Sequence, residues 1–298
     1  RISATLGAVF NDDGRIDARI ATGWDDYAPL SGDIQVNTDE LTWMELFSPD
    51  IVEPTGRLDA DLRLAGTRAA PVIGGEGRLQ DFATELPSLG IELRDGDLRM
   101  QAQADGNARI VGRVRSGDGV LEVDGTLGWQ AQDTPLVLNL RGTNVLIADT
   151  RQLRAIANPD VVVRYRAGQP LQVSGTVTVP EADIHLERLD EGVAVSDDVV
   201  VLDPVDPKRE AANRLDLDLA LVMGKDVNIN GFGLVGTLGG GLRVRAVPGR
   251  EMRGTGTLEV DGRYTAYGQR LQITRGRLLW ANTPIGDPLL DIRAEREV

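Results

Sequence analysis

The residue types that usually carry catalysis are almost absent from this chain. It holds one histidine and no cysteine among 298 residues, which excludes a thiol nucleophile, a cysteine zinc site and a histidine-rich metal site. The histidine, His185, lies between apolar Ile184 and Leu186 and is predicted on the solvent side of a strand. Paired acids such as Asp12 and Asp13 stand in turn-like sequence, where carboxylates solvate loops. We therefore expect no enzyme, no catalytic residue, no metal ligand and no cofactor.

Two glycine-rich segments look like ligand motifs by their letters alone. Gly231–Gly236 (GFGLVG) fits the dinucleotide pattern, but that pattern requires a following helix, whose N-terminus holds the pyrophosphate. The glycines of Thr237–Gly241 do not allow one, so we predict a bend in a sheet. Gly74–Gly77 begins like a calcium-binding β-roll repeat, but Leu79 stands where the aspartate ligand belongs and the repeat is not in tandem.

Charge and composition narrow the class of protein further. The chain has 32 Lys and Arg against 46 Asp and Glu, a formal charge of −14, and only 4% aromatic residues. A surface of this charge repels phosphate backbones, so no nucleic-acid partner is expected. No stretch of 18 apolar residues is present. Because the chain begins with Arg1, we expect a fragment of a longer protein whose anchor lies elsewhere.

Alternation of apolar and polar residues is the dominant pattern. In Gly56–Gly66, leucines and alanine alternate with Asp59, Asp61 and Arg63, and this period of two is typical of strands with one apolar face and one wetted face. Turn signals such as Asp95-Gly96 and Asp124-Gly125 separate the strands. The residues predicted to line the apolar face, and to contact hydrophobic cargo, are Leu58, Leu62, Leu64, Leu98, Leu121, Val123, Val173, Val177, Leu217, Leu219, Leu221, Val244, Leu258 and Leu271.

Helical signals are few. A short helix is predicted near residues 39–47, where Thr38 provides a cap, and one further helical turn over residues 148–157. Residues 203–213 carry charges and two prolines and are predicted to form a loop that is the first site of proteolysis. We expect more than about half of the residues in strands, well above the usual level.

A sheet with one apolar face must cover that face, and helices are too few to do so. The sheet either closes on itself as a sandwich or curls into an open trough, and the 35 glycines favour curling. We predict an all-β fold: a long, curled, mostly antiparallel or mixed sheet that forms an open, taco-like trough with a hydrophobic groove. Residues 1–169 and 170–298 are expected to be two segments of one continuous sheet. An exposed apolar trough of this size would mark a binding site.

A series of segments in the last third carries a family resemblance. These are Val177–Ile184, Val195–Val200, Gly224–Leu234, Gly254–Leu258, Gly262–Leu271 (GRYTAYGQRL), Gly276–Leu278 and Pro288–Ala294. In this order they resemble the TamB C-terminal domain family over residues 170–298. Residues 1–169 are similar only in the looser repeat style of AsmA-like and TamB proteins, best seen in Gly56–Gly66.

The resemblance implies a β-taco fold and a non-enzymatic function in outer-membrane biogenesis. It implies a periplasmic location, within a protein anchored in the inner membrane that reaches the outer membrane. The C-terminal part would meet a TamA-like outer-membrane barrel of the translocation and assembly module. The implied roles are autotransporter and outer-membrane protein assembly and secretion, and phospholipid transport between the membranes.

Two questions stay open at the level of sequence. Acyl chains of phospholipids and unfolded β-barrel strands both suit an apolar groove, and two copies of an isolated fragment could self-associate to hide it. The alternative to a trough is a structural β-solenoid stalk or adhesin fragment with a closed core. If the trough is open, the pattern predicts that a charge at Leu219 or Val244 leaves a folded protein.

Overall fold

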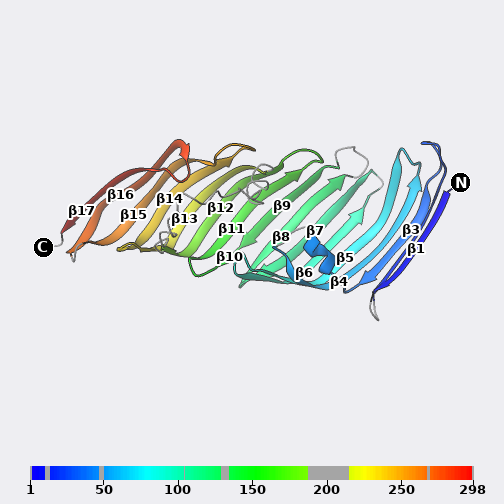
Figure 1. Ribbon diagram of the computed structural model, residues 1–298, viewed down its shortest axis with the longest axis horizontal. Helices are drawn as coiled ribbons and strands as arrows, with labels where there is room; N and C mark the ends of the chain where they lie inside the picture. The colour runs from blue at the N-terminus through cyan, green and yellow to red at the C-terminus, as the bar shows by residue number, and fades with distance from the viewer. Residues whose placement is uncertain are drawn as a thin grey trace, which may run out of the picture. The chain divides into compact units, whose positions relative to one another are not determined.

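The computed structural model describes residues 2–10, 14–46, 50–103, 105–128, 134–186, 215–266 and 269–296. Within these ranges, 79% of the residues lie in strands, and the seventeen strands belong to one open mixed sheet (Figure 1). The all-β prediction is confirmed. The predicted loop over residues 203–213 lies outside the described residues. The chain divides into two compact units: unit 1 holds residues 1–147 and 162–168, and unit 2 holds residues 148–161 and 169–298.

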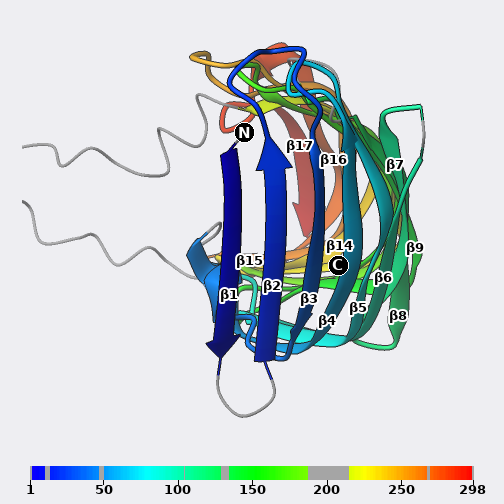
Figure 2. The same ribbon diagram turned by 90° about the vertical axis from the view of Figure 1, so that its right-hand side faces the viewer.

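Unit 1 is a meander of antiparallel strands, each paired with the next along the chain. Figure 2 shows these strands following an arc. Their bounds are β1 (Ile2–Phe10), β2 (Gly14–Thr22), β3 (Ser31–Thr38), β4 (Val52–Gly66), β5 (Pro71–Leu86), β6 (Ile91–Ala102), β7 (Asn107–Ser116), β8 (Gly119–Gly128) and β9 (Leu136–Thr143). A solenoid needs stacked repeats, and consecutive antiparallel hairpins are a different architecture.

A short 3₁₀ helix, η1 (Thr42–Leu46), follows β3 in the region where the sequence predicts a helix. The Thr38 Oγ1 atom accepts a hydrogen bond from the Glu40 backbone N–H at 3.0 Å, and Glu40 Oε1 accepts one from the Thr42 N–H at 3.2 Å. These side chains satisfy backbone donors that a helix start leaves free. The preceding Leu41 is 1% exposed, so it fixes the turn to the sheet.

Unit 2 continues with longer strands. Their bounds are β12 (Leu171–Leu186), β13 (Leu215–Gly231), β14 (Leu234–Ala246), β15 (Arg253–Ala266), β16 (Gln269–Pro284) and β17 (Leu289–Arg296). The pairs from β13 to β17 are antiparallel. β12 and β13 are parallel, with Val173 opposite Leu217 and Val177 opposite Leu221, and this pair makes the sheet mixed.

The division between the units falls within β10 (Val145–Asp149) and β11 (Leu153–Tyr165). The prediction of a helical turn over residues 148–157 is therefore wrong. Ala155 and Ala157 are 4% and 0% exposed, whereas the intervening Ile156 is partly exposed. This alternation is that of a strand, and packing of the small side chains overrides the helical preference of alanine.

Glycines let the backbones of neighbouring strands in unit 1 approach closely. A Cβ atom built on Gly125 of β8 would lie 2.1 Å from the Val137 carbonyl oxygen of β9 and 2.8 Å from Leu138 Cδ2. Any side chain at this position must push backbone aside. At Gly74 of β5, by contrast, a Cβ atom meets nothing within 4 Å.

This contrast gives a prediction about stability. Gly125→Ala should lower the free energy of unfolding by about 1–3 kcal/mol, the usual effect of overpacking. Gly74→Ala should change it by less than about 0.5 kcal/mol. Urea denaturation of both variants provides the measurement, and equal stability of the two proteins would contradict the close approach of β8 and β9.

Candidate apolar binding face

One face of unit 1 carries apolar residues in rows that cross six strands, β4 to β9. Strand register places directly neighbouring residues in each row. The three rows are Leu58–Leu79–Leu98–Gly112–Val123–Leu140, Ala60–Gly77–Met100–Ile110–Gly125–Leu138 and Leu62–Gly75–Ala102–Ala108–Leu127–Leu136. None of these positions bears a polar side chain. We call this surface the apolar face of unit 1.

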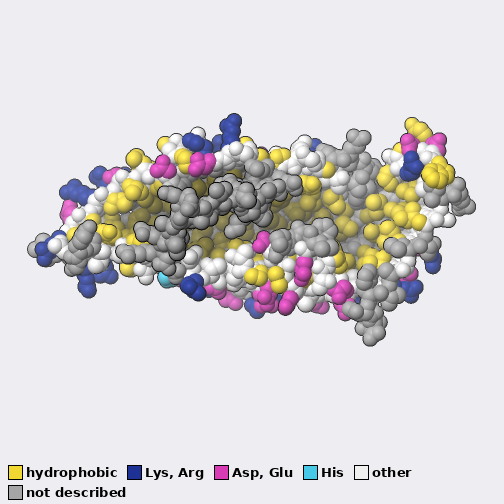
Figure 3. Space-filling view, viewed as in Figure 1, with side chains coloured by type: hydrophobic (Ala, Val, Ile, Leu, Met, Phe, Trp, Pro, Cys, Tyr) yellow, Lys and Arg dark blue, Asp and Glu magenta, His cyan; other side chains and the backbone are white. Residues whose placement is uncertain are grey.

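The predicted residues of unit 1 all lie on this face. Leu58, Leu98 and Val123 share one row and Leu62 is in another; Leu64 lies opposite Ile73, and Leu121 opposite Val114. All six predicted side chains are partly exposed rather than buried. Figure 3 shows hydrophobic side chains gathered in a hollow here, with charged side chains along the rims. Their binding of cargo remains a prediction.

Several residues of these rows are missing from the sequence prediction. Met100, Ile110, Leu138 and Leu140 lie among the predicted side chains by register. Leu136–Leu140 reads as a short run with apolar residues on both faces of the strand, so alternation alone gives no direction for it. Alternation from Leu98 also places Met100 on this face, whereas Ile110, Leu138 and Leu140 are found by strand pairing, which a single sequence does not supply.

The opposite face of unit 1 carries charged side chains in a regular arrangement. Asp97, Arg113, Glu122 and Arg141 are direct neighbours on β6 to β9, so the sign of the charge alternates from strand to strand. They line a cavity of about 520 Å³ on that face. Opposite charges on paired strands stabilise a sheet modestly and keep this surface wetted. The two faces of one sheet therefore differ sharply in polarity.

Unit 2 also has an apolar face, but much of it is filled by its own side chains. Leu242, Val244, Leu258 and Trp280 form a cluster, each 7–8% exposed, with Leu217 and Leu221 packed against it. The Trp280 indole N–H donates to the Ile285 carbonyl at 3.0 Å. A Cβ atom on Gly254 would lie 2.9 Å from the indole, so the ring covers β15 where no side chain stands. We call this the Trp280 cluster.

A second cluster in unit 2 surrounds Val227, which is fully buried. It contains Ala155, Val179, Ala182, Val227, Ile229, Leu238, Val260 and Ile273, with Val177 and Ile184 packed on it.

The structure therefore gathers five of the eight residues predicted in unit 2, namely Val177, Leu217, Leu221, Val244 and Leu258, around two filled clusters. Val173 is paired with Leu217, Leu219 with Val244 and Leu271 with Tyr264; all three are partly exposed.

Asp218 on the polar face of unit 2 is held by two arginines. Arg243 donates to both carboxylate oxygens, at 2.6 and 2.7 Å, and Arg245 donates at 3.3 Å. The hydrogen bonds from Arg243 contribute most to lowering the pKa of Asp218 from 3.8 to about 2. A carboxylate that accepts such charge-assisted bonds is stabilised in its ionised form.

The ion pair predicts a pH dependence of stability. Because the folded-state pKa is depressed, the stabilisation is complete above about pH 5 and is lost as the pH falls toward 2. Asp218→Asn should lower the free energy of unfolding by about 0.5–1 kcal/mol at pH 7, since solvent screens the pair, and by progressively less as the pH falls through about 2. Denaturation curves across this range test it, with Asp216→Asn as a matched control on the same strand face. A deficit in Asp218→Asn that stays constant with pH would contradict the assignment.

The remaining sequence motifs form ordinary structure. Gly231–Gly236 spans the turn between β13 and β14, in which Phe232 and Gly233 both have positive φ, at 53° and 88°. This is the geometry of a two-residue hairpin turn, so the segment joins two strands and is not a bend within the sheet, and a strand follows it where the dinucleotide pattern would need a helix. His185 is exposed on β12. Among the described residues no cluster of three or more His, Cys, Asp or Glu side chains could hold a metal ion.

Within the described ranges, no helix has both the length and the apolar character that a membrane span requires.

Comparison with known proteins adds a family to this geometry. The family model described as the TamB C-terminal domain matches residues 108–298. The chain is 28% identical over 258 residues to the translocation and assembly module subunit TamB of Haemophilus influenzae, an alignment that covers 81% of this chain. The chain spans 19% of the length of that relative. No solved structure matches the chain.

Proposed function

Because the chain belongs to the TamB C-terminal domain family, we propose that it is a non-enzymatic segment of a translocation and assembly module. In this proposal it supports assembly and secretion of outer-membrane proteins, autotransporters included, beside a TamA-like barrel that its C-terminal part contacts. It would act in the periplasm, as part of a protein anchored in the inner membrane. The name and family of the relative support this assignment, which extends to the whole protein only as a proposal.

The apolar face of unit 1 is the proposed binding surface for cargo. The observation that carries this proposal is the set of three rows across six strands without a polar side chain. Its large side chains stay partly exposed, although a folded chain gains by burying them. An acyl chain laid on the face gains about 0.8 kcal/mol for each CH₂ group that leaves water. The face thus favours binding of an apolar guest.

Phospholipid acyl chains fit this face better than unfolded barrel strands do. An extended peptide brings one N–H and one C=O group per residue, and burying them unpaired is costly. The rows offer no hydrogen-bonding side chain, and the backbone groups within β4–β9 are used by strand pairing. An acyl chain needs no such partners. A barrel strand would have to bind at a free sheet edge instead.

Lipid analysis of the purified chain tests this proposal. The protein is purified without detergent, and organic extracts and native mass spectra are examined for bound phospholipid. We expect phospholipid to co-purify, and a chain stripped of lipid to take it up again from vesicles. A chain free of lipid that also takes up none would overturn acyl-chain binding. Self-association is tested in the same spectra, and addition of lipid should dissociate any dimer that hides the apolar face.

A further inference from the structure

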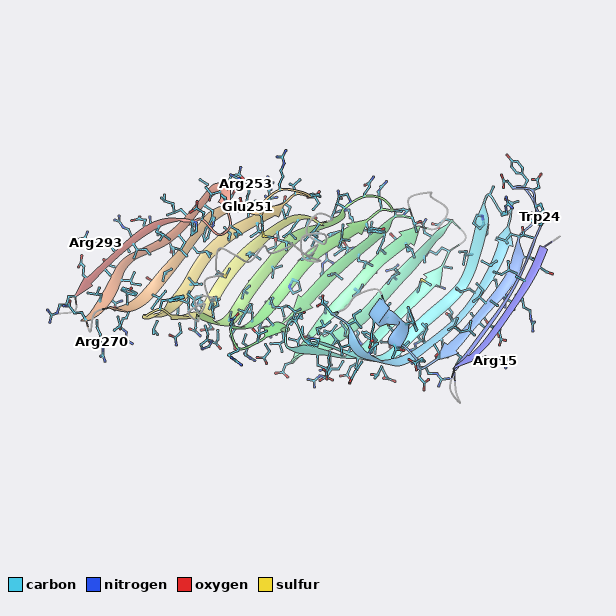
Figure 4. All side chains as sticks on the ribbon, in the orientation of Figure 1. Arg15, Trp24, Glu251, Arg253, Arg270 and Arg293 are labelled. Atoms are coloured by element: carbon cyan, nitrogen blue, oxygen red, sulfur yellow. The ribbon has the colours of Figure 1, made fainter. Side chains whose placement is uncertain are left out.

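The two most exposed aromatic side chains in the described part of the chain lie together on one connection. Trp24 is 79% exposed and Tyr27 is 83% exposed. Both belong to the segment between β2 and β3, and Figure 4 shows Trp24 projecting at the end of these strands. The chain has only four tryptophans and four tyrosines. Tryptophan side chains are highly buried on average and tyrosine side chains are intermediate, so the exposure of Trp24 and Tyr27 needs a physical reason.

The connection is a built structure rather than a loose loop. The Asp25 side chain accepts a hydrogen bond from the Tyr27 N–H at 2.8 Å, and its carbonyl accepts one from the Ala28 N–H at 3.0 Å. At Gly23 a Cβ atom would lie 2.7 Å from the Ala28 Cβ, so glycine permits the close turn. The backbone on both sides of the two aromatic residues is therefore fixed.

The neighbouring β4–β5 connection clamps this turn from the side. The Ala69 N–H donates to the Asp26 carbonyl at 2.8 Å, and the Leu30 N–H donates to the Gly66 carbonyl at 2.9 Å. Arg68 Nη2 is 2.5 Å from Asp26 Oδ1. The entropic cost of ordering the two aromatic residues therefore arises when the chain folds and not when it binds, and a contact of this kind is pre-organised. We call residues 23–30 and 66–70 the aromatic tip.

We propose that the aromatic tip rests in the interfacial layer of a phospholipid bilayer. Tryptophan and tyrosine each combine an apolar ring with a polar N–H or O–H group, and both are enriched where membranes meet water. Two rings on a fixed turn reach only the headgroup level, which suits a peripheral contact. This contact is distinct from the acyl-chain binding proposed for the apolar face.

The size and charge of the tip argue for a lipid surface rather than a protein partner. Two aromatic side chains bury about 150–250 Å² each, well below the roughly 800 Å² per partner of a stable protein interface. Besides the two rings, the tip exposes only the small apolar side chains of Pro29, Ala69 and Ala70, together with the charged side chains of Asp25, Asp26 and Arg68. With two acids and one base, the tip should prefer zwitterionic to anionic lipid headgroups.

Vesicle flotation tests the proposal directly. The 298-residue chain is mixed with phosphatidylcholine vesicles, and the variant Trp24→Ser/Tyr27→Ser is compared with it. We expect the double variant to bind at least about tenfold more weakly, and we expect high salt to leave wild-type binding unchanged. Vesicles of phosphatidylglycerol should bind less protein because the chain carries a charge of −14.

A matched control and a spectroscopic readout complete the test. Phe232→Asn removes another exposed aromatic, in a turn whose positive φ asparagine tolerates, and should bind like wild type. Brominated phosphatidylcholine should quench part of the tryptophan fluorescence, and Trp24→Phe should remove that part. Absence of wild-type binding, or equal binding by the double variant, would overturn the proposal. Leu98→Asp should retain flotation, so failure of the apolar face to bind lipid is distinguishable from failure of the tip.

Discussion

Val244→Asp should unfold unit 2, with a loss of about 3–5 kcal/mol in the free energy of unfolding. Val244 is 7% exposed and packs with Leu242, Leu258 and Trp280. A carboxylate there has no partner within the Trp280 cluster and is kept from water, which is among the most destabilising of single changes. Urea denaturation followed by tryptophan fluorescence, to which Trp280 contributes, gives the measurement.

The control for this variant places the same charge on the polar side of the sheet. Thr255 is exposed on β15 and lies opposite Arg243, so Thr255→Asp should change stability by less than about 0.5 kcal/mol. A Val244→Asp protein that melts like Thr255→Asp would mean that the Trp280 cluster is open to water and not filled.

In unit 1, by contrast, Leu98→Asp should leave a folded protein that has lost most of its acyl-chain binding. Leu98 is partly exposed on the apolar face, so the new carboxylate keeps contact with water and costs at most about 2 kcal/mol. A lipid chain crossing the same row must desolvate the charge. We expect at least a tenfold loss of affinity for a fluorescent fatty acyl probe, equal to about 1.4 kcal/mol.

Val111→Asp is the matched control for Leu98→Asp. Val111 is 44% exposed on the opposite face and neighbours Arg99 and Asp124 by register. The Val111→Asp protein should bind the fluorescent fatty acyl probe like wild type. Equal loss in both variants would show that net charge, and not the apolar face, governs probe binding. A collapse of the melting temperature in Leu98→Asp would show a closed core in unit 1.

The different behaviour expected at Val244 and Leu98 marks the limit of what alternation predicts. Period-two alternation places both residues on an apolar face, and the structure agrees. Alternation does not show whether that face is open or filled. The face is filled by Trp280 of β16, which covers Gly254 of β15, and both residues lie ten or more positions from Val244 in the sequence. The sequence predicts that a charge at Val244 leaves the protein folded, and the buried Trp280 cluster reverses that expectation. Leu219 is partly exposed, so we still expect a charge there to leave the protein folded.

Other features depend on long-range pairing that one sequence does not contain. The all-β class and most strands follow from local alternation and turn residues. The parallel pairing of β12 with β13 joins segments separated by residues 187–214, and no local signal encodes it. The aromatic tip is similar, since its order comes from hydrogen bonds between residues 23–30 and 66–70. Ala155 and Ala157 favour a helix locally and form a strand because their packing requires small side chains.

Site-specific photocrosslinking tests most directly the central claim, that the apolar face of unit 1 binds acyl chains. A benzophenone amino acid is placed in turn at Leu98, on the apolar face, and at Arg99, which is exposed on the opposite face of the same strand. After illumination in living cells, the purified proteins are analysed by mass spectrometry. We predict phospholipid adducts at position 98 and none at position 99. Equal adducts at both positions, or protein adducts alone at position 98, would contradict the claim.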